Sequence, residues 1–536
     1  MDRELFDHFL RDDIRRGPAP DDAFTGAAGG AACGDVARLS LTVARGRVAS
    51  VTFDTEGCGA TRAATAAVAE TIEGATVLEA ASLSIDDAEN LLGGLTPAKR
   101  HAAQLATDAL HRALSAAASS TLPLDQAAPR GEADAATVQG GSGANIEADA
   151  ARVGPDSPTL IGSEGGRVRS PGACRSASPP PPPERVAVAV SGGVDSAVAA
   201  LLERERGADV VAITVKLWAD PETDGTKACC SPEAVLGARA VAHSLGIPHF
   251  TLDLEADFRR RVVGRWVEGY AEGQTPNPCI LCNGEVRLAA MLDLAQRLGA
   301  TRLVTGHYAR IVEDAEGPLL ATGADAAKDQ SYMLAALPPD LLGRLGFPLT
   351  DMTKDEVRAV AARHGLAVAK KPESQDLCFL AGQGKRGFLR RHGNLVDREG
   401  AVVDRAGRTL GHHRGHHNFT VGQRRGIGVS LNEPGYVVAT DAAANTVTVG
   451  SREDLETRRI RVRDAMLHRD GARVDNVRLR YHSATLPATL GAAAPGRHDA
   501  LELELYEPFT AASPGQTAVL MDGETIVGHG TIAAAA

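Results

Sequence analysis

The chain has 536 residues, 43% of them hydrophobic, and a formal net charge of −11, which indicates a globular protein with several cores. No apolar run approaches about 18 residues and the charged start MDRELFDHFLRDD lacks a signal-peptide core, so we expect a cytoplasmic protein without a membrane span. Eight cysteines in such a chain favour metal or thiol chemistry over a disulfide scaffold.

The first part of the chain, residues 1–118, is predicted to form an α+β domain. An amphipathic helix is followed by strand-like alternation at 37–43 and 48–53, and then by alanine-rich helices. Residues 119–184 are rich in Ala, Gly, Ser, Asp and Pro and end in a proline run, which predicts a disordered linker with a stiff end.

Residues 185–380 alternate strand and helix, as in a doubly wound parallel sheet. The apolar run Val186–Val190 leads into Ser191–Ser196 (SGGVDS), and a helix-like segment follows. This order directs backbone N–H groups and a helix N-terminus at an anion. The loop has no lysine where a Walker loop has one. It resembles the pyrophosphatase loop of enzymes that split ATP into AMP and pyrophosphate to adenylate a substrate oxygen.

Further strands are expected along the second half of the chain. In the sheet domain they lie at 210–215, 249–254 and 302–305. Residues 381–455 form a small, basic module rich in Gly and His. Residues 456–536 show short strands at 477–481, 500–506, 517–521 and 525–527, separated by Gly and Pro, which predicts a C-terminal β-barrel.

Three cysteines of the second half stand in polar or proline-rich surroundings. Cys279 and Cys282 belong to TPNPCILCN (275–283), and Cys378 belongs to SQDLCF (374–379). These surroundings predict loops with exposed, reactive thiols. The alternative is a buried structural role, because free cysteine is often buried.

Residues 185–536 resemble the tRNA-specific 2-thiouridylases, which place sulfur on C2 of the wobble uridine. The motifs that carry the resemblance are SGGVDS, TPNPxxxCN, GHYAR (306–310), KDQSY (328–332), SQDLCF, FTVGQR (419–424), Arg480-Tyr481 and PGQ (514–516). The resemblance implies an α/β pyrophosphatase-loop (adenine nucleotide α-hydrolase-like) domain, a small central tRNA-binding domain and the barrel, together acting as a tRNA-uridine 2-sulfurtransferase.

The same resemblance implies roles for individual residues. ATP, with Mg²⁺, would lie on Ala189, Val190, Ser191, Gly192, Gly193, Val194, Asp195 and Ser196, enclosed by Val215 and Gly306. The uridine C2 oxygen would attack the α-phosphate, a persulfide on Cys378 would attack C2, and Cys282 would release the thiolated base by attacking Cys378. The tRNA contacts would be His307, Lys328, Asp329, Gln330, Arg480, Tyr481 and Gln516.

Two details of the resemblance leave alternatives open. Many relatives carry Asp where this chain has Cys279, so Cys279, Cys282 and Cys378 are also candidate ligands of a [4Fe–4S] cluster that holds a sulfide, in place of the persulfide route. The histidines of His412–His417 suggest a metal site, but the G-x-H-x-G pattern of the relatives favours an RNA-facing loop.

Residues 1–118 resemble the iron–sulfur scaffold domains of the IscU/NifU N-terminal type. The resemblance rests on ACGD (32–35), GCG (57–59) and KRH (99–101). Cys33, Asp35, Cys58 and His101 are the implied metal ligands, while Ala102 replaces the third cysteine of the scaffolds. Three interpretations follow: a metal or cluster site serving the second half, a dock for a cysteine desulfurase or sulfur-relay protein, or a structural relic.

Two other functions compete with tRNA thiolation. The first is an iron–sulfur cluster assembly protein built on an adenylating fold, for which cluster transfer would need no ATP. Another adenylating enzyme, such as a tRNA-lysidine synthetase or an amidotransferase-type synthetase, would need neither Cys282 nor Cys378.

Overall fold

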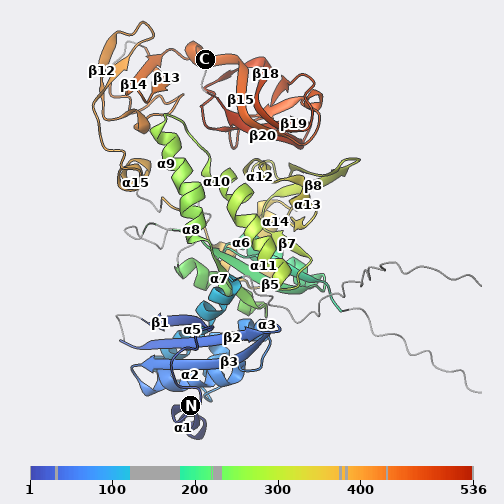
Figure 1. Ribbon diagram of the computed structural model, residues 1–536. Helices are drawn as coiled ribbons and strands as arrows, with labels where there is room; N and C mark the ends of the chain where they lie inside the picture. Colours follow the sequence, from blue (N-terminus) through green and yellow to red (C-terminus); the bar gives the residue numbers. More distant parts are fainter. Residues whose placement is uncertain are drawn as a thin grey trace, which may run out of the picture. The chain divides into compact units, whose positions relative to one another are not determined.

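The computed structural model describes residues 2–29, 34–120, 182–218, 220, 232–372, 377–380, 384–429 and 433–533. The predicted linker at 119–184 lies almost wholly outside these ranges. Cys33, Cys174, Cys229, Cys230 and residues 374–376 of SQDLCF also lie outside them. The architecture is multidomain, with an α+β domain, an α/β domain, a small β domain and a barrel, as the sequence predicts (Figure 1).

The N-terminal domain is a three-stranded antiparallel sheet, in the order β1-β2-β3, with helices against it. Its elements are α1 (Arg3–Leu10), β1 (Phe24–Gly29), β2 (Val36–Ala44), β3 (Arg47–Glu56), α2 (Gly59–Ile72), α3 (Val77–Ser82), α4 (Ile85–Asn90) and α5 (Arg100–Ala118). The predicted strands β2 and β3 are confirmed, and β1 was missed. A Cβ atom on Gly26 would lie 2.1 Å from the Ala109 carbonyl, so glycine lets α5 approach β1 closely.

The α/β domain contains a parallel sheet in the order β10-β7-β4-β5-β6. Its strands are β4 (Arg185–Ala189), β5 (Asp209–Lys216), β6 (His249–Asp253), β7 (Arg302–Thr305) and β10 (Leu345–Gly346), which confirms the predicted strands. Its helices are α6 (Val194–Glu205), α7 (Pro232–Ser244), α8 (Glu255–Phe258), α9 (Gly264–Ala271), α10 (Pro278–Leu281), α11 (Leu288–Arg297), α12 (Ser331–Leu334), α13 (Pro339–Leu342) and α14 (Lys354–Arg363). The chain order reverses beside β4, and the crevice at such a point is where α/β sheets bind ligands.

The small β domain follows helix α15 (Gly384–His392). Its sheet has the order β12-β11-β14-β13, formed by β11 (Gly400–Val403), β12 (Thr409–His413), β13 (Tyr436–Asp441) and β14 (Thr446–Gly450). Val402, Val437, Val447 and Val449 alternate with more exposed neighbours and form its small core.

The C-terminal strands close into a barrel because β15 pairs with both β18 and β20. The strands are β15 (Glu456–Leu467), β16 (Asn476–Arg478), β17 (Leu486–Thr489), β18 (Gly496–Thr510), β19 (Thr517–Asp522) and β20 (Thr525–Ile532). The predicted barrel is confirmed, although β15 and β17 were missed and β16 ends before Arg480. A hairpin of β8 (Ala309–Asp314) and β9 (Gly317–Thr322) extends this sheet through β20.

None of the helices in the described ranges combines the length and the apolar character needed to cross a membrane.

Candidate nucleotide, thiol and metal sites

The Ser191–Ser196 loop forms a tight strand-to-helix turn between β4 and α6. Gly192 has φ +70°, and a Cβ atom there would lie 3.2 Å from the Ala238 nitrogen, so both conformation and space favour glycine. The Ser196 hydroxyl accepts a bond from the Ser191 N–H and donates to the Gly193 carbonyl, each at 3.1 Å. Gly193 is the N-cap of α6. The loop therefore presents a helix N-terminus at the end of a buried strand, as anion binding requires.

Other residues expected at the nucleotide lie on neighbouring strands. A Cβ atom on Gly306, directly after β7, would lie 2.7 Å from the Ser196 nitrogen. Val215 is buried on β5, and the Val190 N–H donates to the Ile213 carbonyl at 2.9 Å. Since β7, β4 and β5 are adjacent and parallel, these residues meet at the carboxyl edge of the sheet.

Two lysines from distant parts of the chain lie on this loop, and the sequence reasoning missed both. The Lys354 ammonium donates to both carboxylate oxygens of Asp195 at 2.8 Å. The Tyr308 hydroxyl donates to the same carboxylate at 2.9 Å. The Lys371 ammonium donates to the Gly192 carbonyl at 2.9 Å. The capping box of Thr353 and Glu356, visible in the sequence, would have placed Lys354 at the start of a helix, but not beside the loop.

The cysteines of TPNPCILCN are helical, which corrects the prediction of a loop. Pro278 occupies the first turn of α10, where proline is favoured, and the Asn277 side chain accepts the Cys279 N–H at 3.0 Å. Cys282 is buried and begins a π-helical turn, Cys282–Arg287, a form that is frequent at functional sites. Cys378 is half-buried and borders the same large apolar cluster that contains Cys282.

Cys279, Cys282 and Cys378 are not among the groups of described residues whose ligand atoms lie within 4.8 Å of one another, the spacing expected around a single metal ion. Among the described residues, the three-donor group with mutually close ligand atoms is Asp35, Cys58 and His101. A four-iron cluster needs its thiolates around one centre. The thiolates of such a cluster are spaced more widely than the ligands of a single ion, so the cluster alternative at these cysteines stays a prediction.

The residues expected to contact tRNA fall into two classes. Lys328 is half-buried and Arg480 is exposed, although the Arg480 guanidinium also donates to the Ala511 carbonyl at 3.0 Å. Tyr481 lies with its ring 6.1 Å from that of Tyr332. These side chains remain candidates for direct contact with RNA.

The other expected tRNA contacts are buried or half-buried and are hydrogen-bonded to other parts of the protein. Asp329 is buried and accepts bonds from Ser331 and, at 2.6 Å, from Arg478. The Gln330 side chain accepts the Tyr308 N–H at 3.1 Å. The Gln516 amide donates to the Thr275 carbonyl at 2.7 Å, next to the cysteine segment. In this conformation they position neighbouring segments.

His307 follows β7 and is neutral. The Arg287 guanidinium has only hydrogens to offer, so the Nε2 atom of His307, at 3.2 Å, must accept. The Nδ1 atom then carries the proton and lies 2.7 Å from the Thr305 hydroxyl. Burial and the positive charge of Arg287 lower the His307 pKa to about 3.

Three of the four histidines of 412–417 are buried, so the expectation of an RNA-facing loop stays a prediction for the rest of the segment. His413, His416 and His417 are buried, and only His412 and Arg414 are exposed. The His416 ring is bonded to the Ala271 carbonyl at 3.0 Å and lies 3.3 Å from the Asn445 side-chain oxygen. Any RNA contact in this segment falls to the two exposed side chains.

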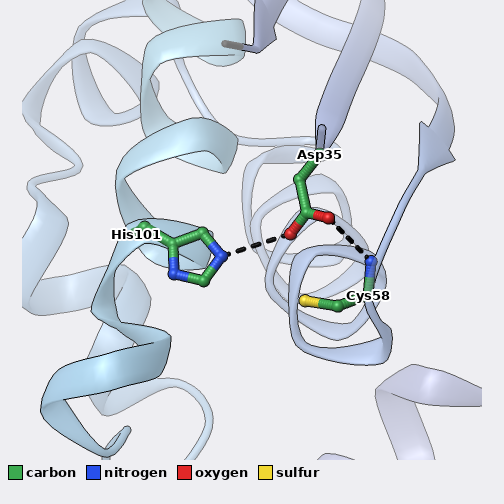
Figure 2. Close-up of side chains that lie close together, drawn as sticks. All are labelled: Asp35, Cys58 and His101. Carbon is green, nitrogen blue, oxygen red and sulfur yellow. Dashed lines mark hydrogen bonds and ion pairs between the residues drawn. The ribbon is translucent and has the colours of Figure 1, made fainter. Parts of the chain in front are cut away.

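In the N-terminal domain, Asp35, Cys58 and His101 converge from three elements (Figure 2). The Asp35 carboxylate accepts the Cys58 N–H at 3.0 Å and the Thr61 hydroxyl at 2.7 Å. Hydrogen bonds from the Cys58 side chain, from Thr61 and from the Cys58 backbone lower the Asp35 pKa to about 2. A Cβ atom on Gly57 would lie 2.0 Å from this carboxylate, so glycine is required there.

The His101 ring is oriented as a metal ligand. Its Nδ1 atom lies 3.0 Å from the Ala98 carbonyl, which can only accept, so Nδ1 carries a proton. Its Nε2 atom then faces an Asp35 carboxylate oxygen at 3.2 Å. The Nε2 atom of His101 and the Asp35 oxygen are both acceptors, so they repel each other unless a cation, either a proton or a metal ion, lies between them. A histidine that donates its second nitrogen to a carbonyl is the usual arrangement at metal centres.

Comparisons with known proteins agree with this division of the chain. Residues 2–121 match the NifU-like N terminal domain, 184–382 the tRNA methyl transferase HUP domain, 386–451 the tRNA methyl transferase PRC-barrel domain and 458–532 the Aminomethyltransferase beta-barrel domain. The bifunctional protein NifU/MnmA of Rubrobacter xylanophilus is 44% identical over 95% of this chain and 93% of its own length. The chain belongs to the bifunctional NifU/MnmA family.

Family membership confirms both resemblances read from the sequence. The MnmA part alone matches tRNA-specific 2-thiouridylases. The enzyme of Sorangium cellulosum is 44% identical over 68% of this chain and 96% of its own length, and that of Moorella thermoacetica is 43% identical over 64% and 98%. The Fervidobacterium islandicum iron–sulfur scaffold structure covers 21% of this chain and 94% of its own, at 22% identity and a TM-score of 0.19, too low to support a conclusion.

Proposed function

We propose that this NifU/MnmA chain catalyses ATP-dependent 2-thiolation of the wobble uridine of tRNA. The observation that carries the proposal is the SGGVDS loop at the switch point of the parallel sheet, with Gly306 against it and with Cys282 and Cys378 in the same domain. The names of its thiouridylase relatives supply the substrate class.

The first step is adenylation. The uridine C2 oxygen attacks the α-phosphorus, the bond to the β-phosphate breaks, and pyrophosphate leaves with the electron pair. The N3 proton of uridine passes to solvent, so that an O-adenylated base remains. The loop N–H groups and the N-terminus of α6 orient the phosphates for this attack.

The second step transfers sulfur. A persulfide on Cys378 attacks C2 with its outer sulfur, and AMP leaves with the C–O bonding electrons. The Cys282 thiolate then attacks the inner sulfur of Cys378, which forms a disulfide and releases the 2-thiouridine. An external dithiol reduces the disulfide before the next turnover. Cys282 is buried within, and Cys378 packs against, the same apolar cluster, which keeps this thiol exchange away from bulk solvent.

The N-terminal domain is assigned a supporting role in the same proposal. Cys58, Asp35 and His101, with Cys33 as a further candidate, would hold iron or zinc, and the domain would pass sulfur or a cluster toward Cys378 or receive it from a cysteine desulfurase. Covalent fusion raises the local concentration of donor near acceptor. A scaffold function is therefore a second, subsidiary candidate.

The test uses the full chain with ATP, unmodified tRNA and a persulfide source, followed by mass spectrometry of the nucleosides. We expect 2-thiouridine formation that depends on ATP and releases AMP and pyrophosphate. Two of the matching domain descriptions name methyl transfer, so the control reaction contains a methyl donor and no sulfur source. A methylated nucleoside in the control reaction would contradict the proposal, and so would 2-thiouridine formation that persists in Cys378→Ser.

A further inference from the structure

The nucleotide loop has an unmet electrostatic requirement. Its residues, Ser191 to Ser196, include the carboxylate of Asp195 and no cationic side chain. The triphosphate of ATP is strongly negative, and the pyrophosphate that leaves during adenylation gains further charge. A site that cleaves at the α-phosphate needs positive charge where that pyrophosphate departs.

Lys354 supplies a buried cation at this place. Its side chain is only 10% exposed, and its ammonium holds Asp195 through two bonds of 2.8 Å. The ammonium also lies 5.9 Å from the centre of the Tyr308 ring, whose hydroxyl donates to the same carboxylate. The backbone N–H of Lys354 donates to the Asp325 carboxylate, so the main chain at Lys354 is held in place as well.

The position of Lys354 is unfavourable for stability alone. It is the first residue of α14, and a helix N-terminus carries partial positive charge that disfavours a cation. Burial of an ammonium costs further free energy. Asp195 offsets these costs, yet Asp195 is itself in the loop that receives the phosphates. This arrangement is expected of a cation held ready for an anionic ligand.

Lys371 adds a second cation from another segment. It follows the short helical turn Ala367–Lys370, and its ammonium donates to the Gly192 carbonyl at 2.9 Å. Gly192 occupies the left-handed region at the tip of the loop. Two lysines remote in sequence are thus bonded to two residues, Gly192 and Asp195, of the same six-residue loop.

We propose that Lys354 and Lys371 are the phosphate-binding cations of this site and contact the β- and γ-phosphates, a role that rests on the proposed adenylation. During the step, the uridine C2 oxygen bonds to the α-phosphorus and the α–β bridging bond breaks. Its electrons leave on pyrophosphate, and the N3 proton goes to solvent. The two ammonium groups neutralise the charge that develops on pyrophosphate.

The experiment measures binding of magnesium pyrophosphate and of AMP separately, by calorimetry on the full chain without tRNA. In Lys354→Gln and in Lys371→Ala we expect pyrophosphate affinity to fall about 10- to 100-fold, the effect of losing charge-assisted hydrogen bonds. AMP affinity should change by less than about twofold. In reactions with tRNA, AMP release by Lys354→Gln should slow about 100- to 1000-fold. Lys370→Ala, an exposed neighbour on the same segment, is the matched control.

Each result decides the proposal. Equal loss of AMP and pyrophosphate binding in the two variants indicates a structural role and overturns it, and so does unchanged binding of both. If Lys354→Gln or Lys371→Ala binds pyrophosphate as well as Lys370→Ala does, the lysine that was replaced does not bind the phosphates. Lys371→Ala keeps the test valid if Lys354→Gln does not fold, because Lys371 is exposed. Pyrophosphate binding needs no tRNA, so failure of tRNA thiolation is detected independently.

Discussion

Two histidines, one in each half of the chain, show opposite designs. In the N-terminal domain, Nε2 of His101 faces the Asp35 carboxylate at 3.2 Å and requires a cation between them. In the α/β domain, Nε2 of His307 faces the Arg287 guanidinium at 3.2 Å and must stay neutral. The first neighbourhood is built to hold a cation. The second already contains its cations as side chains.

The difference indicates how the two halves divide the work. Around the nucleotide loop, positive charge comes from Lys354 and Lys371, and we propose that Cys282 and Cys378 carry the sulfur chemistry. In the N-terminal domain the donors are mixed sulfur, oxygen and nitrogen, which suits a metal ion that is exchanged or passed on. The predictions below test this division from its largest consequence to its smallest.

The largest effect is expected at Cys378. Cys378→Ser should lower 2-thiouridine formation by more than about 1000-fold, because the proposed sulfur-carrying nucleophile is lost, while adenylation of tRNA with release of pyrophosphate still occurs. Cys279→Ser is the matched control and should keep most of the activity. Liquid chromatography of the nucleosides and a pyrophosphate assay on the same reaction measure the two steps separately. Loss of activity in Cys279→Ser to the same extent would favour a cluster at the three cysteines.

The next effect concerns metal binding by the N-terminal domain. Cys58→Ser should lower zinc or iron affinity by at least about 100-fold, since a ligand contributes more than its supporting contacts. Thiolation with a persulfide source in excess should change by less than about twofold. Elemental analysis and competition with a chelator give the affinity, and His8→Ala, an exposed histidine of α1, serves as control. Undiminished metal content in Cys58→Ser would remove the N-terminal site from the account.

A smaller effect is expected from Asp35→Asn in the metal-free protein. The Asp35 pKa is lowered to about 2 in the folded chain, against 3.8 in the unfolded chain. The carboxylate therefore stabilises the fold at any pH above 3.8, and this stability is lost as the pH falls through about 2. We expect a loss of about 2 kcal/mol at pH 7, from weakened charge-assisted hydrogen bonds. Hydrogen-exchange protection of α2 amides should show the same difference at pH 7 and pH 5. A difference that shrinks over that range would contradict the assignment.

The smallest effect is a missing titration. Because the His307 pKa is lowered to about 3, its ring should show no protonation between pH 8 and pH 5 by carbon-labelled histidine NMR. The unfolded chain binds this proton near pH 6.5 and the folded chain does not, so His307 lowers stability progressively as the pH falls from 6.5 to about 3. Arg287→Gln should raise the pKa by removing the neighbouring charge. Titration of His307 near pH 6.5 in the unaltered chain would be the contrary result.

Much of this arrangement could be predicted because its determinants are contiguous. The SGGVDS loop between an apolar strand and a helix identifies both fold class and nucleotide chemistry within a dozen residues. The strands β2 to β7 can be predicted because their apolar residues either alternate with polar ones or form continuous runs. β1 was not predicted because its sequence, FTGAAG, is rich in glycine and alanine and shows no strand pattern. Small residues are needed there because α5 packs closely against the strand.

The remainder depends on contacts between distant residues. Lys354 and Lys371 contact the loop from more than a hundred residues away in the chain. From the sequence alone, each would be predicted to be an ordinary solvent-exposed lysine. Proline suggested a loop at Cys279, but Pro278 begins a helix. The histidines of 412–417 suggested an exposed cluster, whereas packing against Asn445 and Ala271 buries most of them. In each case tertiary contacts overrode a local signal.

The most direct test of the central claim compares single-turnover 2-thiouridine formation by metal-loaded and metal-stripped full-length protein. Both are prepared without oxygen and supplied with ATP, unmodified tRNA and a persulfide source. The account predicts equal rates, because Cys378 and Cys282 carry the sulfur chemistry and the metal belongs to the N-terminal domain. Activity confined to the metal-loaded protein would contradict it and would place a cluster at the site of sulfur transfer.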